Sequence, residues 1–254
     1  MARVHFVGAG PGAADLITIR GKTLLEEADV VVYAGSLVNP ELLNYAKPGC
    51  EAVNSASMTL DEVIDTIKTA VVREKNVVRL HTGDPGIYGA IREQMDKLSE
   101  LGIEYDICPG VSSFNAASAS LKAEYTLPGV TQTVILTRAA GKTPVPGRES
   151  IRSLAAHGAT MVLFLSAGLL ESAVRDLIEG GYAPDTPAAI VYKASWPDEK
   201  IIRCTVSEAA CAAAENNIGK TALVCVGGFL EGAYDLSRLY SPDFSTGYRA
   251  AKNK

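Results

Sequence analysis

The stretch Val77-Val78-Arg79-Leu80-His81-Thr82-Gly83-Asp84-Pro85 begins as an apolar run and ends in a turn. A segment with helical spacing follows it, so we expect a strand, a loop and then a helix. Two similar loops, Gly8–Gly12 and Pro109–Ser113, also follow apolar runs. Ligands of open α/β sheets bind outside the carboxyl ends of the strands. Three loops with few side chains therefore predict a ligand site at one edge of a parallel sheet.

The first half of the chain alternates short apolar runs with amphipathic segments. We expect strands over 4–7, 30–33, 77–80 and 103–108, and helices over 18–28, 60–73, 86–101 and 112–121. This alternation predicts a largely parallel sheet that is covered on both faces.

The second half has a different pattern. We expect strands over 133–137, 161–165, 187–192, 200–206 and 222–226, and helices over 169–179 and 207–216. The turn Trp196-Pro197-Asp198-Glu199 favours an antiparallel hairpin, which would make this sheet mixed. Pro128-Gly129 interrupts the pattern, so we expect domains over 1–122 and 123–240, followed by a polar tail over 241–254.

Composition excludes several classes of protein. The net charge of -5 argues against a nucleic-acid-binding protein. No apolar stretch is long enough to span a bilayer. The five cysteines contain no Cys-x-x-Cys pair and the three histidines have no metal-ligand spacing, so we expect no disulfide framework and no metal site. A reducing cytoplasm is the expected compartment.

Each glycine loop has a second interpretation. Gly8–Ala13 fits the dinucleotide fingerprint G-x-G-x-x-G/A, but Pro11 interrupts it and no carboxylate follows the second strand. A tight connection explains this loop equally well. Asp84 is a favoured N-cap residue and suits either a helix cap or a ligand loop. Ser112 or Ser113 suits an N-cap or a carboxylate site at a helix N-terminus.

One basic residue has a notable position. Arg138 ends an apolar run and opens the Gly/Pro-punctuated loop that carries Lys142. Long loops often carry function, and a guanidinium there could form a bidentate pair with a substrate carboxylate.

Together these segments resemble the tetrapyrrole methyltransferases, which methylate uroporphyrinogen- and precorrin-type macrocycles with S-adenosylmethionine. The resemblance covers about residues 4–230 and includes the loops that start at Gly8, Gly83 and Pro109. Three longer stretches, His81–Gly89, Thr131–Arg138 and Val191–Lys200, resemble the subfamily of precorrin-4 and cobalt-precorrin-4 C(11)-methyltransferases of corrin (cobalamin) biosynthesis. Members often carry an acidic residue where this chain has Gly35.

The resemblance implies a two-domain α/β fold, a homodimer, and S-adenosylmethionine held in the cleft between the domains. It implies cofactor contacts from Pro11, Thr82, Gly83, Asp84, Ile87, Ser112, Ser113, Leu165, Ala189, Thr221, Ala222 and Leu223. Arg138, Lys142 and Lys193 are the hypothesised grips on the substrate's carboxylates. Catalysis would proceed by positioning, with no protein nucleophile and no metal.

Three other functions remain open at this point. The first is a methyltransferase that acts at another position of a precorrin or uroporphyrinogen. The second is a nicotinamide-dependent oxidoreductase that uses the Gly8 loop. The third is a non-catalytic protein that binds tetrapyrroles.

Overall fold

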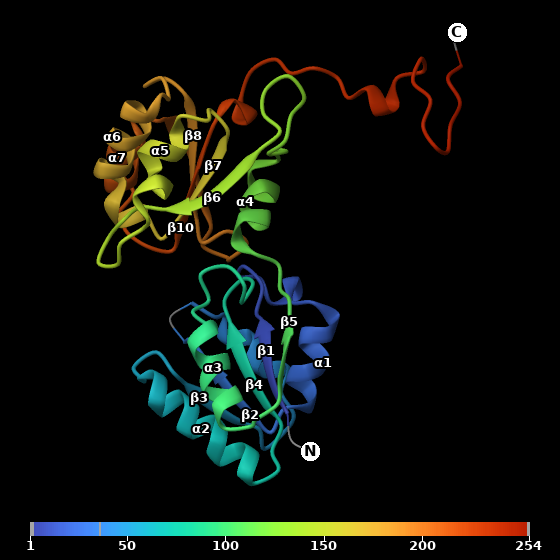
Figure 1. The fold of residues 1–254 in the computed structure, drawn as a ribbon, viewed down its shortest axis with the longest axis vertical. Helices are drawn as coiled ribbons and strands as arrows, with labels where there is room; N and C mark the ends of the chain where they lie inside the picture. Colours follow the sequence, from blue (N-terminus) through green and yellow to red (C-terminus); the bar gives the residue numbers. More distant parts are fainter. Residues whose placement is uncertain (1–2, 36, 253–254) are drawn as a thin grey trace. The chain divides into compact units, whose positions relative to one another are not determined.

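The computed structural model describes residues 3–35 and 37–252, which form two units (Figure 1). The first unit runs to Ser120 and also includes Lys193–Lys200. The second holds Leu121–Tyr192 and the chain from Ile201 onward. The division lies close to the expected boundary at 122, but residues 193–200 belong to the first unit although we expected them in the second domain.

The sheet of the first unit has the order β3-β2-β4-β1-β5, and each pair of neighbouring strands in it is parallel. Its strands are β1 (Val4–Gly8), β2 (Val30–Tyr33), β3 (Glu51–Asn54), β4 (Val77–His81) and β5 (Tyr105–Cys108). Because β1 lies between β4 and β5, the loops that follow these three strands leave the same edge of the sheet side by side.

Helices cover both faces of this sheet (Figure 1). The covering helices are α1 (Ile19–Glu27), α2 (Leu60–Val72) and α3 (Arg92–Glu100). Helix α4 (Ser113–Leu121) follows β5, and the division between the two units falls at its end. Ile64 and Ile67 of α2 and Leu98 of α3 pack with Val4 and Phe6 of β1 on one face. Leu25 of α1 packs with Val7, Val31 and Leu80 on the other. Burial of these apolar side chains holds the layers together.

The sheet of the second unit has the order β6-β7-β10-β8-β9 and is mixed. Its strands are β6 (Val134–Arg138), β7 (Thr160–Phe164), β8 (Pro187–Tyr192), β9 (Lys200–Thr205) and β10 (Ala222–Val226). β6 is parallel to β7, while β10 is antiparallel to β7 and to β8. The N–H of Val206 donates to the carbonyl of Thr186, so the end of β9 lies beside the start of β8, as in the expected hairpin.

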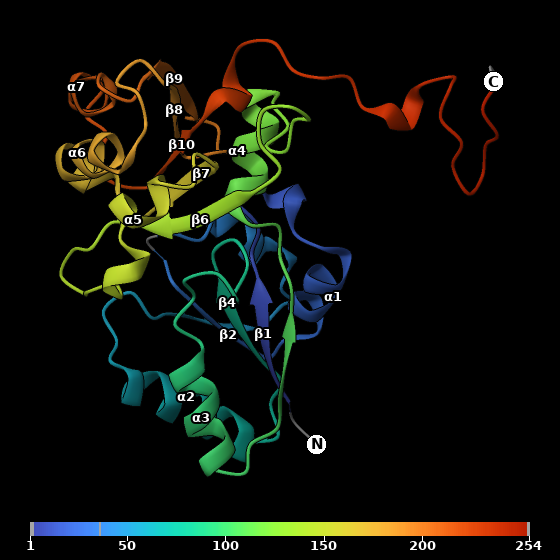
Figure 2. The ribbon, with the colours of Figure 1, turned by 45° about the horizontal axis from the view of Figure 1, so that its top comes forward.

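Three helices gather beside this sheet (Figure 2). They are α5 (Ile151–Ala155), α6 (Leu170–Gly180) and α7 (Ala209–Glu215). They form one core with the strands, in which Leu177 and Ala213 pack with Met161, Ile190 and Val224. Short 3₁₀ segments complete the structure at Ala14–Leu16, Pro40–Tyr45, Gly147–Glu149, Ala167–Leu169, Gly228–Leu230 and Arg238–Tyr240.

The expected α/β fold with a parallel first sheet and a mixed second sheet is confirmed, but three elements differ from expectation. α3 begins at Arg92 rather than at residue 86, because Tyr88 and Ala90 have φ values of 56° and 49° that no right-handed helix accommodates. The edge strand β3 and the short helix α5 were not predicted. β3 has no buried residue and α5 has only five residues, so neither shows a clear apolar period.

The expected polar tail folds upon itself around one arginine. The Arg249 guanidinium donates to the carbonyls of Leu239 and Ser241, at 2.8 and 2.7 Å. Within residues 3–35 and 37–252, no helix is long and apolar enough to cross a membrane.

Candidate functional site

Three glycines bring the loops after β1, β4 and β5 into backbone contact. A Cβ built on Gly8 would lie 2.5 Å from the Cα of Gly110 and 2.7 Å from the carbonyl oxygen of Gly83. Real Cβ atoms do not approach so closely, so a side chain at this point would force the loops apart. The three loops thus form one wall at the carboxyl edge of the sheet, where ligands of α/β folds bind.

The loop after β4 is paired with the loop after β1. Gly83 donates its N–H to the carbonyl of Gly10 at 2.8 Å, and Gly10 donates back to Gly83 at 3.2 Å. The N–H and the carbonyl of the buried Gly83 are therefore paired within the protein. The side chain of the preceding residue, Thr82, is exposed.

Asp84 joins two of the loops through its carboxylate. Oδ1 accepts the N–H of Gly86 at 2.8 Å, within its own turn. Oδ2 accepts the N–H of Gly110 at 2.9 Å, in the loop after β5. Hydrogen bonds to a charged acceptor are shorter and stronger than neutral ones. Asp84 therefore fixes the turn and its neighbour together.

The helix-cap interpretation of Asp84 is wrong, because Pro85–Tyr88 forms turns and α3 starts only at Arg92. Ile87, a proposed cofactor contact in this turn, is half-buried. The cap interpretation fits the third loop better. The carbonyl of the buried Ser112 accepts from Asn115 at 3.0 Å, and Ser113 is the first residue of α4.

The geometry of the Gly8–Ala13 loop does not suit a dinucleotide phosphate. A phosphate-binding fingerprint leads directly into a helix whose N–H groups face the phosphate. Here α1 starts only at Ile19, and Thr18 caps it by accepting the N–H of Gly21 at 3.1 Å. The buried Asn39 also donates to the carbonyl of Gly12 at 2.9 Å, which keeps the loop closed on the protein.

Two buried residues of β4, Arg79 and His81, lie beneath this edge, and the sequence analysis did not identify them. Arg79 of β4 is 7% exposed, and its guanidinium donates to Gln94 at 3.0 Å and to the carbonyl of Val32 at 3.2 Å. Gln94 in turn donates to the carbonyl of Ala90, so this chain of hydrogen bonds supports the loop before α3. Burial lowers the pKa of Arg79 to about 10. The sequence signal for this buried residue was a charged side chain within the otherwise apolar run 77–80.

His81 shares that face of the sheet. Burial, and secondarily the charge of Arg79, lower the pKa of its imidazole to about 3. Its Nε2 atom is buried and has no hydrogen-bond partner in the described part of the chain. His81 is therefore neutral at physiological pH.

In the second unit, most of the proposed cofactor contacts share one sheet edge. Leu165 follows β7, and Thr221, Ala222 and Leu223 lie at the start of β10, which runs antiparallel to β7. Leu165 is 67% exposed, and both Leu165 and Thr221 have left-handed φ values, of 52° and 55°. Such strain in residues other than glycine is concentrated at functional sites. Ala189 differs, because it is fully buried in the middle of β8.

The three proposed substrate grips have different surroundings. The Arg138 guanidinium donates to the carbonyls of Ala139, Thr143 and Pro144, at 3.3, 3.2 and 2.8 Å, and so shapes its own loop. Lys142 is exposed at the tip of that loop. Lys193 belongs to the first unit, where its ammonium lies 2.6 Å from Oδ2 of Asp198.

The presence of glycine at position 35, two residues after β2, is explained by its contact with Asn54. Its N–H donates to Oδ1 of Asn54 at 3.1 Å, and a Cβ at this position would lie 2.6 Å from Cγ of Asn54. Asn54 therefore occupies the space that an acidic side chain at position 35 would need.

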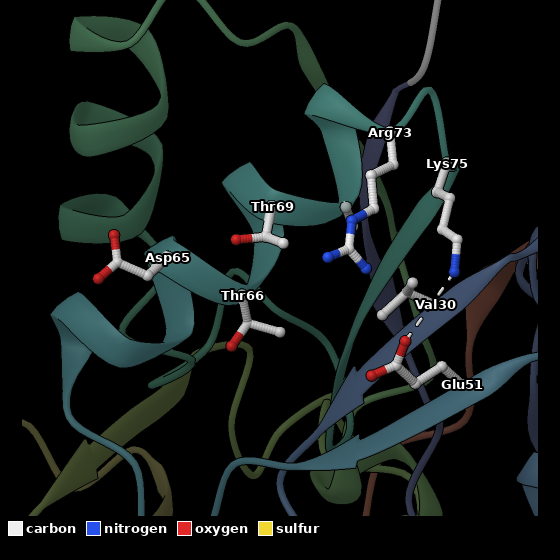
Figure 3. A pocket seen from close by; sticks show the side chains of 8 residues that line it. Val30, Glu51, Asp65, Thr66, Thr69, Arg73 and Lys75 are labelled. Atoms are coloured by element: carbon white, nitrogen blue, oxygen red, sulfur yellow. Dashed lines mark ion pairs between the residues drawn. The ribbon is translucent and has the colours of Figure 1, made fainter.

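A separate pocket of about 330 Å³ opens at the opposite edge of the first sheet (Figure 3). Val30 and Glu51, which start β2 and β3, line it together with Thr66, Arg73 and Lys75. It lies at the amino ends of the strands, away from the glycine loops, and contains none of the proposed site residues. Among the residues described by the structure, no three His, Cys, Asp or Glu side chains are grouped to hold a metal ion.

We predict that Asp84→Asn lowers the free energy of unfolding by about 1–3 kcal/mol, because an amide has only one acceptor oxygen for the two N–H groups. Urea unfolding would measure it. Asp65→Asn, on the exposed side of α2, is the control and should change stability by less than about 0.5 kcal/mol. Equal values for the two variants would contradict the bridging role of Asp84.

His81 predicts a dependence of stability on pH. Below the ordinary histidine pKa of about 6.5 the unfolded chain gains a proton that folded His81 refuses until about pH 3, so stability falls by about 1.4 kcal/mol per pH unit across that window. Relative to wild type, His81→Leu should therefore lose about 2 kcal/mol less between pH 7 and pH 5. His157→Leu, at an exposed position, is the control for replacing a histidine by leucine. Identical slopes in all three proteins would refute the prediction.

Comparison with known proteins gives the family. Residues 3–210 match the model of the tetrapyrrole (corrin/porphyrin) methylases. The chain is similar to the cobalt-precorrin-4 C(11)-methyltransferase of Methanocaldococcus jannaschii, with 54% identity over 99% of this chain and 98% of that protein.

Two solved structures share the fold. A cobalt-precorrin-4 methyltransferase of cobalamin biosynthesis superposes with a TM-score of 0.88 and 48% identity, covering 91% of this chain and 96% of the other. A uroporphyrin-III C-methyltransferase from Thermus thermophilus, complexed with S-adenyl homocysteine, gives a TM-score of 0.74 at 28% identity, covering 91% and 94%. On these findings, the chain belongs to the tetrapyrrole methylase family.

Proposed function

We propose that this chain transfers a methyl group from S-adenosylmethionine to carbon 11 of precorrin-4 or cobalt-precorrin-4, in corrin (cobalamin) biosynthesis. The observation that carries the proposal is the extent of the similarity, which spans nearly the whole of both chains for a relative named for this reaction. The relative's name favours the cobalt form of the substrate, and the test below includes both forms.

S-adenosylmethionine supplies a methyl group that is already activated on a positively charged sulfur. The accepting carbon is electron-rich and loses no proton as it becomes quaternary, so the protein needs no general base in that step. The chain's own contribution is to hold the two reactants in line and to exclude water. The loops that meet at Gly8, Gly83 and Gly110 pack too closely to admit side chains, and their joined backbone would give the reactants a fixed surface.

The proposed donor contacts divide between the two units. The first supplies Pro11, Thr82, Gly83, Asp84, Ile87, Ser112 and Ser113, and the second supplies Leu165, Ala189, Thr221, Ala222 and Leu223. Within the first unit Thr82 is exposed, and within the second unit Leu165 is exposed, so each is accessible to a ligand. For Gly83 the contact would be through Cα, because its N–H and carbonyl are paired with Gly10.

The tetrapyrrole carries several carboxylates. We assign their recognition to Lys142, which is exposed, and to Arg138, which holds the loop of Lys142 in shape and keeps N–H groups beyond the three it uses for carbonyls. Lys193 is the third candidate, although its ammonium is paired with Asp198.

A homodimer in the cytoplasm is part of the proposal. The C-terminal segment exposes Leu236, Tyr240 and Tyr248, apolar surface that a second copy of the chain would cover. The proposed cytoplasmic location rests on the sequence, whose five cysteines contain no Cys-x-x-Cys pair.

Incubation of the purified protein with labelled S-adenosylmethionine and precorrin-4, with or without cobalt, tests the proposal. We expect a product heavier by one methyl group, with the label on carbon 11 by NMR. Methylation at another ring position would correct the regiochemistry. Binding of the tetrapyrrole without methyl transfer would favour a carrier, and binding of NADH but not S-adenosylhomocysteine would favour an oxidoreductase.

Lys142→Ala should raise the KM for the tetrapyrrole about two- to fivefold, as expected for an exposed ion pair, and leave the KM for the methyl donor unchanged. Arg138→Ala removes three hydrogen bonds within the loop and should raise the same KM further. Lys68→Ala, an exposed charge on α2, should leave both constants at wild-type values. If both loop variants match Lys68→Ala in steady-state kinetics, this loop does not hold the substrate.

A further inference from the structure

Residues 193–200, which run from the end of β8 to the first residue of β9 and form the tip of this hairpin, pack within the first unit. There the tip is bonded to the loop after β1. The indole Nε1–H of Trp196 donates to the carbonyl of Pro11 at 3.1 Å. The N–H of Ala13 donates to Oγ of Ser195 at 3.0 Å. Two adjacent residues of this tip thus hold the two ends of Pro11–Ala13.

Gly12 between them leaves the space in which the indole lies. A Cβ built on Gly12 would lie 2.8 Å from Cγ of Trp196 and closer still to Cδ1 and Nε1. Gly12 does not have a left-handed φ, so the requirement for glycine here is steric. The loop and the indole are complementary in shape as well as in hydrogen bonding.

The tip is itself held in an unusual conformation. Lys193 and Ser195 have left-handed φ values of 48° and 68°. Glu199 stabilises this turn, because Oε2 accepts the N–H of Ser195 at 2.6 Å and the hydroxyl of Ser120 at 2.7 Å. The Lys193 ammonium lies 5.4 Å from the centre of the Trp196 ring and is paired with Asp198. Strained residues that the surroundings over-determine are typical of functional segments.

We propose that Trp196 and Ser195 are positioning residues for the methyl donor, acting through Pro11. Pro11 is a proposed donor contact, and its neighbour Gly10 is paired with Gly83 of the second glycine loop. A shift of Pro11 would therefore also move the loop that carries Thr82 and Asp84. This inference rests on the proposed use of S-adenosylmethionine.

Trp196 is the only tryptophan of the chain, so intrinsic tryptophan fluorescence reports this contact alone. Saturating S-adenosylhomocysteine should change the emission of the wild-type protein. Gly12→Ala should displace the indole and shift its emission to longer wavelength, although the substitution lies outside residues 193–200. The matched control is Gly147→Ala, where an added Cβ meets no atom within 4 Å and the emission should stay unchanged.

Calorimetric titration with S-adenosylhomocysteine gives the affinities. Trp196→Phe removes one hydrogen bond to the loop and should weaken binding about three- to tenfold. In steady-state kinetics the KM for the methyl donor should rise while kcat changes less. Ser195→Ala keeps the indole and removes one acceptor, so it carries the test, with a loss of about threefold, if Trp196→Phe does not fold.

The outcomes separate this inference from the proposed function. A wild-type protein that binds no S-adenosylhomocysteine contradicts the proposed function and this inference with it. If the wild type binds but its tryptophan emission stays constant, the positioning role is refuted while the methyltransferase stands. Folded variants of Gly12, Ser195 and Trp196 that all bind with wild-type affinity lead to the same conclusion.

Discussion

The approach of three backbone segments at Gly8, Gly83 and Gly110 is the constraint on which the rest of this structure depends. Any Cβ at Gly8 or Gly110 would lie within 2.7 Å of another loop's backbone, so the loops after β1, β4 and β5 can meet only without side chains. Because they meet, Gly10 can pair with Gly83, and Asp84 can reach the N–H of Gly110. The edge is consequently a surface of hydrogen-bonded backbone rather than a set of independent loops.

Beneath this edge, the buried guanidinium of Arg79 makes hydrogen bonds that stabilise the fold, but its burial has a desolvation cost. Arg79 is buried with no carboxylate paired to it among the described residues, and hydrogen bonds to Gln94 and Val32 offset only part of the desolvation. The same bonds connect β4 to Ala90, which ends a loop with two left-handed residues. A buried polar network of this kind favours a single arrangement over many. The turn that follows Thr82 is therefore stabilised by this buried network as well as by the loops after β1 and β5.

Much of the fold could be predicted because short apolar runs mark the strands in both halves of the chain and amphipathic segments mark the longer helices. The bounds of β2, β8 and β10 match the predicted ranges, and α1 begins one residue after the predicted helix start at residue 18. The failures have physical causes. Asp84-Pro85 has the composition of a helix start, yet the carboxylate is used between loops, which no local pattern reveals. The pairing of Gly83 with Gly10 joins segments far apart in the sequence, and so does the contact of Trp196 with Pro11.

The contact of Gly35 with Asn54 has a consequence for how this family can diverge. The amide of Asn54 lies where the side chain of residue 35 would begin, and it also accepts the N–H of that residue. An acidic residue at position 35 is therefore incompatible with asparagine at position 54 in its present rotamer. The two positions form one unit of variation, so a carboxylate could enter at the end of β2 only together with a smaller or reoriented neighbour at the end of β3.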